Sequence, residues 1–185
     1  MRRVLSVLLM FSLLTGCKSM KGTDPALVLR EKLLTANGCS FRTVITADYG
    51  DHYYVFTLDC TADSSGDISF TVVSPETISG ITGTIDQAGG NLTFEDQILA
   101  FPLVADDQLS PISAPWLLVR TLRSGYISSG GQDGEYYKLQ MDDSYEEDPL
   151  RADIWLDDGN IPTHCDFMWD NKRILSVEIA NFAFL

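Results

Sequence analysis

Two alternating runs of residues, joined by a two-residue turn, constrain this fold more than any other feature of the sequence. Residues 40–49 and 52–59 flank Gly50-Asp51, a pair suited to the positive φ angles of a tight hairpin turn. Pairing across this turn sets Tyr49 opposite His52, Ala47 opposite Tyr54, Ile45 opposite Phe56, Thr43 opposite Leu58 and Phe41 opposite Cys60. Nearly all of these residues are apolar or aromatic, so the pattern predicts an antiparallel hairpin with one buried face.

Two helices are expected on either side of a group of strands. Asp24-Pro25 supplies an N-cap and a proline at the first helical position, and an apolar stripe of Ala26, Leu29 and Leu33 follows. A second helix is predicted within residues 111–123, closed by Gly125. It carries apolar residues on one side: Ile112, Trp116, Val119 and Leu122.

Short alternating runs predict further strands on both sides of the second helix. They cover residues 68–73, 81–86, 92–95, 98–101, 136–141, 154–156, 163–169 and 173–184. Gly130-Gly131 is interpreted as a flexible loop. No internal repeat or second-domain boundary is visible, so residues 24–185 are expected to form a single α+β domain. We expect a long, curved antiparallel sheet with helices lying against its apolar face.

The N-terminus has the organisation of a secretion signal. Arg2 and Arg3 precede an apolar segment, residues 4–14, which is shorter than the roughly twenty residues that a membrane-spanning helix needs. The segment ends in Leu14-Thr15-Gly16-Cys17, which resembles the lipobox of bacterial lipoproteins. The resemblance implies cleavage of residues 1–16 as a signal peptide and acylation of Cys17, with residues 17–23 as lipidated cysteine and short tether. An ordinary secretory signal is the alternative.

Composition excludes one class of partner. The chain has 26 acidic residues against 13 lysines and arginines, and a formal net charge of −13. A surface this acidic repels nucleic acid and anionic lipid headgroups at long range, so no nucleic acid partner is expected. The expected location is extracytoplasmic, on a membrane held through Cys17. The outer face of the cytoplasmic membrane is favoured over the outer membrane.

The layout of the domain and several short phrases resemble a known family. These phrases include Val73-Ser74-Pro75-Glu76, Leu92-Thr93-Phe94-Glu95-Asp96, Ile161-Pro162 and Val177-Glu178-Ile179-Ala180-Asn181-Phe182. Together with one helix followed by many strands, they are similar to the LolA/LolB-like lipoproteins, including uncharacterised Gram-positive members. The resemblance implies an incomplete β-barrel around an apolar cavity that helices close and that receives acyl chains.

No catalytic or metal-binding constellation is predicted. His164 and Cys165 are adjacent on an expected strand, so their side chains point to opposite faces and cannot converge on one site. No C-x-x-C or H-x-x-x-H spacing of a zinc site occurs, and no cofactor is expected. Cys39 and Cys60 are diagonal neighbours in the predicted hairpin. They form either a disulfide or two reduced core cysteines.

The sequence therefore leads to a membrane-anchored binding module without catalysis. Its predicted cavity, which holds an acyl chain or another apolar ligand, is lined by Phe41, Ile45, Tyr54, Phe56, Phe70 and Trp116. The same residues suit a plain hydrophobic core, and the sequence does not separate the two. The alternative function is an envelope interaction or sensor protein that has a filled core and presents its acidic surface to a protein partner.

Overall fold

The computed structural model describes residues 24–50, 52–95, 97–105, 108–145 and 149–185 of the chain. The predicted signal peptide, Cys17 and the tether lie outside these residues. Among the helices described, none is long and apolar enough to cross a bilayer.

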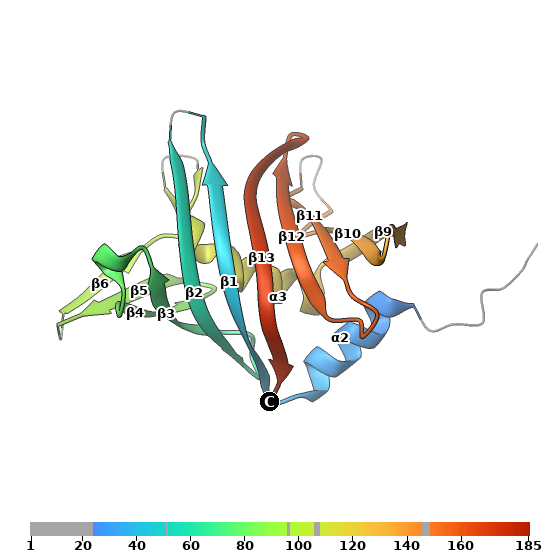
Figure 1. Cartoon of the computed structure of the whole chain (residues 1–185), viewed down its shortest axis with the longest axis horizontal. Helices are drawn as coiled ribbons and strands as arrows, with labels where there is room; N and C mark the ends of the chain where they lie inside the picture. The colour runs from blue at the N-terminus through green and yellow to red at the C-terminus, as the bar shows by residue number, and fades with distance from the viewer. Residues whose placement is uncertain (1–23, 51, 96, 106–107, 146–148) are drawn as a thin grey trace, which may run out of the picture.

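Eleven antiparallel strands form one curved, open sheet, which confirms the predicted fold class (Figure 1). Its order is β6-β5-β4-β3-β2-β1-β13-β12-β11-β10-β9, so the first and last strands of the chain pair at its centre. On one side lie β1 (Gly38–Asp48), β2 (Tyr53–Asp63), β3 (Ile68–Ser74), β4 (Thr82–Asp86), β5 (Gly89–Phe94) and β6 (Gln97–Phe101). On the other lie β9 (Tyr126–Asp133), β10 (Tyr136–Asp142), β11 (Arg151–Leu156), β12 (Pro162–Trp169) and β13 (Lys172–Phe184).

The β1–β2 hairpin has the register that the alternating pattern predicts. Ala47 pairs with Tyr54, Ile45 with Phe56, Thr43 with Leu58, and Phe41 with Cys60. The odd-numbered residues of β1 from Cys39 to Ala47 are buried, whereas Arg42 faces solvent and pairs with Asp59 at 2.6 Å. The buried face of this hairpin is the concave face of the sheet.

Two helices cover that concave face. Helix α2 (Pro25–Thr35) begins as predicted, since the Asp24 side chain accepts a hydrogen bond from the Ala26 amide at 3.0 Å. Helix α3 (Ala114–Ser124), preceded by the short helix η2 (Pro111–Ser113), crosses behind the strands in Figure 1. Eight of its residues are buried: Ala114, Pro115, Trp116, Leu117, Leu118, Val119, Thr121 and Leu122. With these residues buried, the helix is enclosed by the domain on most of its circumference, and it fills much of the concavity.

The long connection between β6 and α3 contains a small second sheet. Strands β7 (Val104–Ala105) and β8 (Gln108–Leu109) pair with each other, and the short helix η1 (Glu76–Ile78) lies earlier, between β3 and β4. Among the described residues, the buried apolar cluster runs from Ala26 to Ile179.

One prediction is wrong. Gly130-Gly131 is not a loop but part of the edge strand β9, where Gly130 pairs with Leu139 and Gly131 with Lys138. This edge strand is exposed along almost its whole length. It therefore has no buried face and no apolar alternation, the signal by which the other strands are recognised.

Candidate functional site

An apolar pocket of about 840 Å³ lies at the end of the sheet where the β1–β2 hairpin turns. The antiparallel order brings four connections to this end: the β1–β2 turn, the β12–β13 turn, the β10–β11 connection and the β7–β8 hairpin. Helix α3 contributes Trp116, Leu117 and Arg120. The pocket is thus assembled from segments far apart in the sequence.

Most of the pocket wall is apolar. Its apolar lining residues come from five separate segments: Tyr49, Leu103, Val104, Leu109, Trp116, Leu117, Leu150, Trp169 and Ile174. Small-molecule sites in proteins are typically concave, mostly apolar and about 300–1,000 Å³ in volume, with a few polar groups that orient the ligand. The pocket meets each of these criteria.

A hydrogen bond from Tyr49 connects the β7–β8 part of the pocket wall to the main sheet. The Tyr49 hydroxyl donates to the Leu109 carbonyl, which ties the end of β1 to the β7–β8 segment. Burial raises the pKa of Tyr49 to about 12, so the hydroxyl keeps its proton and remains a donor at physiological pH. Because Tyr49 is the last residue before the hairpin turn, this bond fixes the turn beside the pocket.

Five charged residues also line the pocket: Asp48, Arg120, Asp143, Lys172 and Arg173. Both carboxylates accept hydrogen bonds from backbone amides of their own connections. Asp48 accepts from Gly50 at 2.9 Å, and Asp143 accepts from Leu150 at 2.9 Å. The Arg120 guanidinium lies 5.1 Å from the centroid of the Trp116 ring, a cation–π distance.

The residues predicted for the cavity are distributed over three environments. Trp116 lines the pocket, whereas Ile45 is fully buried in the core between the sheet and the helices. Phe41 and Phe70 are also buried, and the Phe70 ring lies where a Cβ on Gly83 would come within 2.5 Å. The structure therefore places these three in the filled part of the domain.

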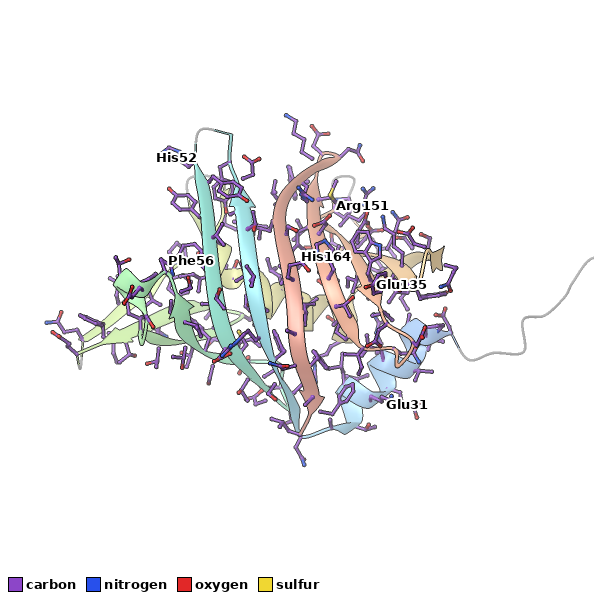
Figure 2. All side chains as sticks on the ribbon, in the orientation of Figure 1. Glu31, His52, Phe56, Glu135, Arg151 and His164 are labelled. Carbon is purple, nitrogen blue, oxygen red and sulfur yellow. The ribbon has the colours of Figure 1, made fainter. Side chains whose placement is uncertain are left out.

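Tyr54 and Phe56 lie on the concave side of β2 but outside the pocket. The Tyr54 side chain is 42% exposed, and its ring lies 6.3 Å from that of Phe56 and 6.1 Å from that of His52. Figure 2 shows His52 at the tip of the hairpin and Phe56 farther along β2. These rings form an aromatic row that leads away from the hairpin turn.

The three cysteines of the described domain are buried free thiols. Burial raises the pKa of Cys39 to about 11 and that of Cys60 to about 12, and it raises the pKa of Cys165 as well. The disulfide between Cys39 and Cys60 is not formed in the structure. Thiols held protonated in this way are poor nucleophiles.

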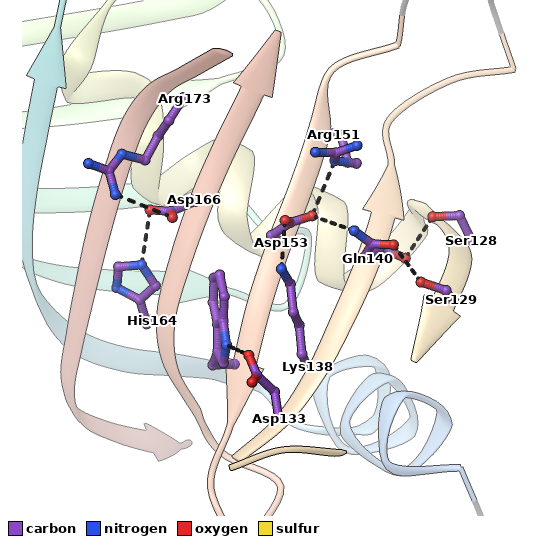
Figure 3. Close-up of polar contacts among 11 residues, drawn as sticks. Ser128, Ser129, Asp133, Lys138, Gln140, Arg151, Asp153, His164, Asp166 and Arg173 are labelled. Carbon is purple, nitrogen blue, oxygen red and sulfur yellow. Dashed lines mark hydrogen bonds and ion pairs between the residues drawn. The ribbon is translucent and has the colours of Figure 1, made fainter. Parts of the chain in front are cut away.

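His164 belongs to a polar network on the opposite face of the sheet from Cys165 (Figure 3). Its Nε2 lies 2.9 Å from Asp166, and its Nδ1 lies 3.0 Å from Glu178. The Asp166 hydrogen bond raises the pKa of His164 more than burial lowers it. Burial is the largest single influence on Asp166 and raises its pKa, but hydrogen bonds from His164 and Ser176, together with the charges of His164 and Arg173, lower the pKa overall. Asp166 also lies 3.5 Å from Arg173, which lines the pocket.

A second network lies beside the first on the same face. Asp153, which is buried, accepts from Lys138 at 2.9 Å and lies 3.2 Å from Arg151. Lys138 also lies over the Trp155 ring at 4.5 Å, and the Trp155 indole donates to Asp133 at 2.8 Å. In the described part of the chain, no three His, Cys, Asp or Glu side chains gather in a way that could hold a metal ion. Both networks consist of ion pairs and hydrogen bonds on the outer face.

A second hollow, of about 600 Å³, lies over β1–β5. Its lining side chains on the outer face are hydroxyl-rich, and they surround the Arg42–Asp59 ion pair: Ser40, Thr61, Ser69, Thr71, Thr82, Thr84 and Thr93. Phe41 and Phe70 also line this hollow but are each only 3% exposed, so they offer a ligand little aromatic surface. The apolar pocket beside α3 is therefore the stronger candidate.

Sequence reasoning missed most of the pocket. Leu103, Leu109 and Leu150 lie in connections, where isolated apolar residues have no periodicity to mark them. Trp169 and Lys172 flank the turn Asp170-Asn171, and a turn of this composition is typical of a solvent-exposed loop. The available signal was that tryptophan and leucine occur in segments otherwise rich in turn residues.

Comparisons with known proteins find similarity in structure only. No protein-family model matches the chain, and no curated protein matches its sequence. An uncharacterised conserved protein from Thermus thermophilus is similar at a TM-score of 0.47 and 10% identity, over 86% of this chain and 85% of that one. A LolA superfamily protein from Nitrosomonas europaea gives 0.44 and 9%, over 88% and 94%. The lipoprotein LppX of Mycobacterium tuberculosis gives 0.38 and 10%, over 86% and 96%. Identities of this size assign no ligand and no activity to the chain.

Proposed function

We propose that this domain is a membrane-anchored, non-catalytic binding module that holds an acyl chain or a similar apolar ligand in the pocket beside α3. The observation that carries the proposal is an apolar wall around about 840 Å³ of space at the hairpin end of the sheet. Helix α3 and the buried apolar cluster fill much of the rest of the concavity. The resemblance to LolA/LolB-like lipoproteins agrees with this proposal.

The test uses residues 18–185, purified natively without acylation at Cys17. Native mass spectrometry and organic extraction identify any lipid that co-purifies, and added palmitate is titrated against tryptophan fluorescence. Two of the three tryptophans, Trp116 and Trp169, line the pocket, so ligand entry changes their emission.

A matched pair of variants separates the pocket from general apolar surface. Leu109→Glu places a charge in the pocket wall, and Ile98→Glu places the same charge on β6, where the side chain is 73% exposed. The proposal expects Leu109→Glu to abolish binding and Ile98→Glu to retain it. A ligand-free protein that binds neither palmitate nor phospholipid would instead favour the second candidate.

The second candidate function is an envelope interaction or sensor protein. The net charge of −13 supports it, because an acidic surface attracts a basic partner and sets its orientation. Binding of this kind weakens steeply with added salt, whereas binding of an uncharged acyl ligand such as monopalmitoyl glycerol in an apolar pocket does not.

A further inference from the structure

Positive charge is concentrated at the mouth of a pocket in a strongly acidic protein. Three of the chain's 13 lysines and arginines line this pocket: Arg120, Lys172 and Arg173. They come from α3 and from the start of β13, and the fold brings them to the same cavity. Resting on the function proposed above, we propose that the ligand is an amphiphile with an anionic head, and that Arg120 and Lys172 bind the head.

Most arginines elsewhere in the domain are paired, whereas the Lys32 ammonium lies over the Phe184 ring, at 5.8 Å from its centroid. Arg30 and Arg123 donate to backbone carbonyls, and Arg42 forms a two-bond pair with Asp59. In contrast, neither Arg120 nor Lys172 lies within 4 Å of a carboxylate oxygen of the described residues.

Arg173 follows Lys172 directly on β13, and its guanidinium lies 3.5 Å from Asp166 of the outer-face network. Adjacent residues on a strand point to opposite faces, so Arg173 is not counted among the residues that bind the head.

The acidic residues of the pocket do not cancel this charge by direct contact. Asp48 and Asp143 bond to the backbone amides of Gly50 and Leu150. The Trp116 ring holds the Arg120 guanidinium beside the apolar wall. A polar head bound there leaves the tail against Leu117 and the other apolar lining residues.

The chemistry of the donors defines the class of head. A guanidinium and an ammonium together bind carboxylate or phosphate oxygens through charge-assisted hydrogen bonds. A neutral or zwitterionic head satisfies them less well. The predicted ligand is thus a single-tailed or small anionic amphiphile, with a carboxylate or a phosphate at its head.

The experiment compares three ligands with the same tail, each below its micelle concentration. Palmitate, palmitoyl lysophosphatidic acid and monopalmitoyl glycerol are titrated into residues 18–185 by calorimetry. We expect either or both anions to bind about tenfold more tightly than the glycerol ester, and higher salt to reduce that preference. The stronger of the two anions distinguishes a carboxylate head from a phosphate head.

Matched double variants test the residues. Arg120→Gln with Lys172→Gln removes the two unpaired cations, and Lys32→Gln with Arg42→Gln removes the same charge from exposed positions away from the pocket. The first pair should reduce the preference for anions at least about fivefold, and the second should leave it within about twofold.

Three results would overturn the inference in different ways. If the glycerol ester binds as tightly as both anions, the pocket binds the apolar tail and does not discriminate between headgroups. If both double variants lose the preference equally, net charge rather than these residues is responsible. If none of the three ligands binds, the proposed function falls together with the inference.

Discussion

Two arginines one turn apart on helix α3 have different surroundings, one where the helix meets α2 and one where it meets the pocket. On the side facing α2, Arg123 donates to the carbonyls of Leu33 at 2.9 Å and Ser64 at 2.7 Å. On the pocket side, Arg120 lies over Trp116 and has no carboxylate within 4 Å in the part of the chain described. Arg123 therefore links α3 to neighbouring backbone, whereas Arg120, one turn earlier, lines the pocket.

The α2 side is a reciprocal arrangement. Arg30 of α2 donates to the carbonyls of Leu122 and Gly125 at the end of α3, at 2.9 and 2.6 Å, while Arg123 of α3 donates to the end of α2. The last carbonyls of a helix lack intrahelical partners, and a cation there also interacts favourably with the helix dipole. The comparison shows that the arginine hydrogen bonds that join α2 to α3 lie where the two helices meet, whereas the space for a ligand lies where α3 meets the pocket.

The largest effect should come from the buried body of α3. Leu118→Ala removes a fully buried side chain, and we expect it to lower the free energy of unfolding by about 2–5 kcal/mol. Val104→Ala, at the pocket rim and 54% exposed, should cost less than about 0.5 kcal/mol. Urea denaturation measures both. If both variants lowered the free energy of unfolding equally, the pocket rim would contribute as much stability as the core, and the proposed difference between the two regions would be wrong.

The next largest effect tests the reciprocal arginines. Arg30→Met or Arg123→Met should each lower the free energy of unfolding by about 1–3 kcal/mol, because helix-end carbonyls lose charged donors. Arg120→Met retains the contact with Trp116 and should cost less than about 0.5 kcal/mol. Thermal and urea unfolding provide the values. A large loss in Arg120→Met would assign that residue a structural role and argue against its binding a ligand.

A smaller effect should appear with pH on the outer face behind the pocket. The pKa of His164 lies above its ordinary value of 6.5, mainly because of the Asp166 hydrogen bond. Its charged form therefore contributes stability that is complete below pH 6.5 and is lost as the pH rises through the raised pKa. We expect wild type to be more stable than His164→Gln by up to about 1 kcal/mol at pH 6, and by less at pH 8.5.

The control for this titration is the α2 side of α3. Arginines keep their charge throughout this pH range, so the penalty of Arg123→Met should be the same at pH 6 and pH 8.5. If the Arg123→Met penalty changed with pH as the His164→Gln penalty does, the titration would not belong to the His164 network.

The smallest effect concerns the thiols and leaves stability unchanged. Cys39, Cys60 and Cys165 are buried with raised pKa values, so a thiol reagent at pH 8 should label none of them in the folded domain. After denaturation without reductant, three thiols of residues 18–185 should react. A count of one would show that the oxidised domain contains the disulfide left open by the sequence.

Local pattern predicted those parts of the fold that have one buried face. The β1–β2 register follows from alternation alone, because a shift of one residue would bury Arg42 and expose Ile45. The start of α2 follows from Asp24 and Pro25. The edge strand β9 was not predicted, because almost all of its residues are exposed and its sequence therefore shows no apolar alternation.

The candidate site was predictable in kind but not in place. A concave apolar face lined with aromatic residues was expected, yet Phe41, Ile45 and Phe70 pack in the filled core, and only Trp116 of the predicted set lines the pocket. The filling element is α3, whose burial on nearly all sides depends on what it packs against.

The sequence by itself determined the strand pairing of the central hairpin, the two helices, the acidic surface and the predicted acylation signal at its N-terminus. Each of these depends on neighbours within a few residues or across one turn, where periodicity and spacing carry the information. Only the tertiary structure decided where the remaining space lies and which cations face it. Arg120 on α3 and Lys172 at the start of β13 are separated in the sequence by four strands, β9 to β12, and the packing of α3 against the concave face brings both to one cavity.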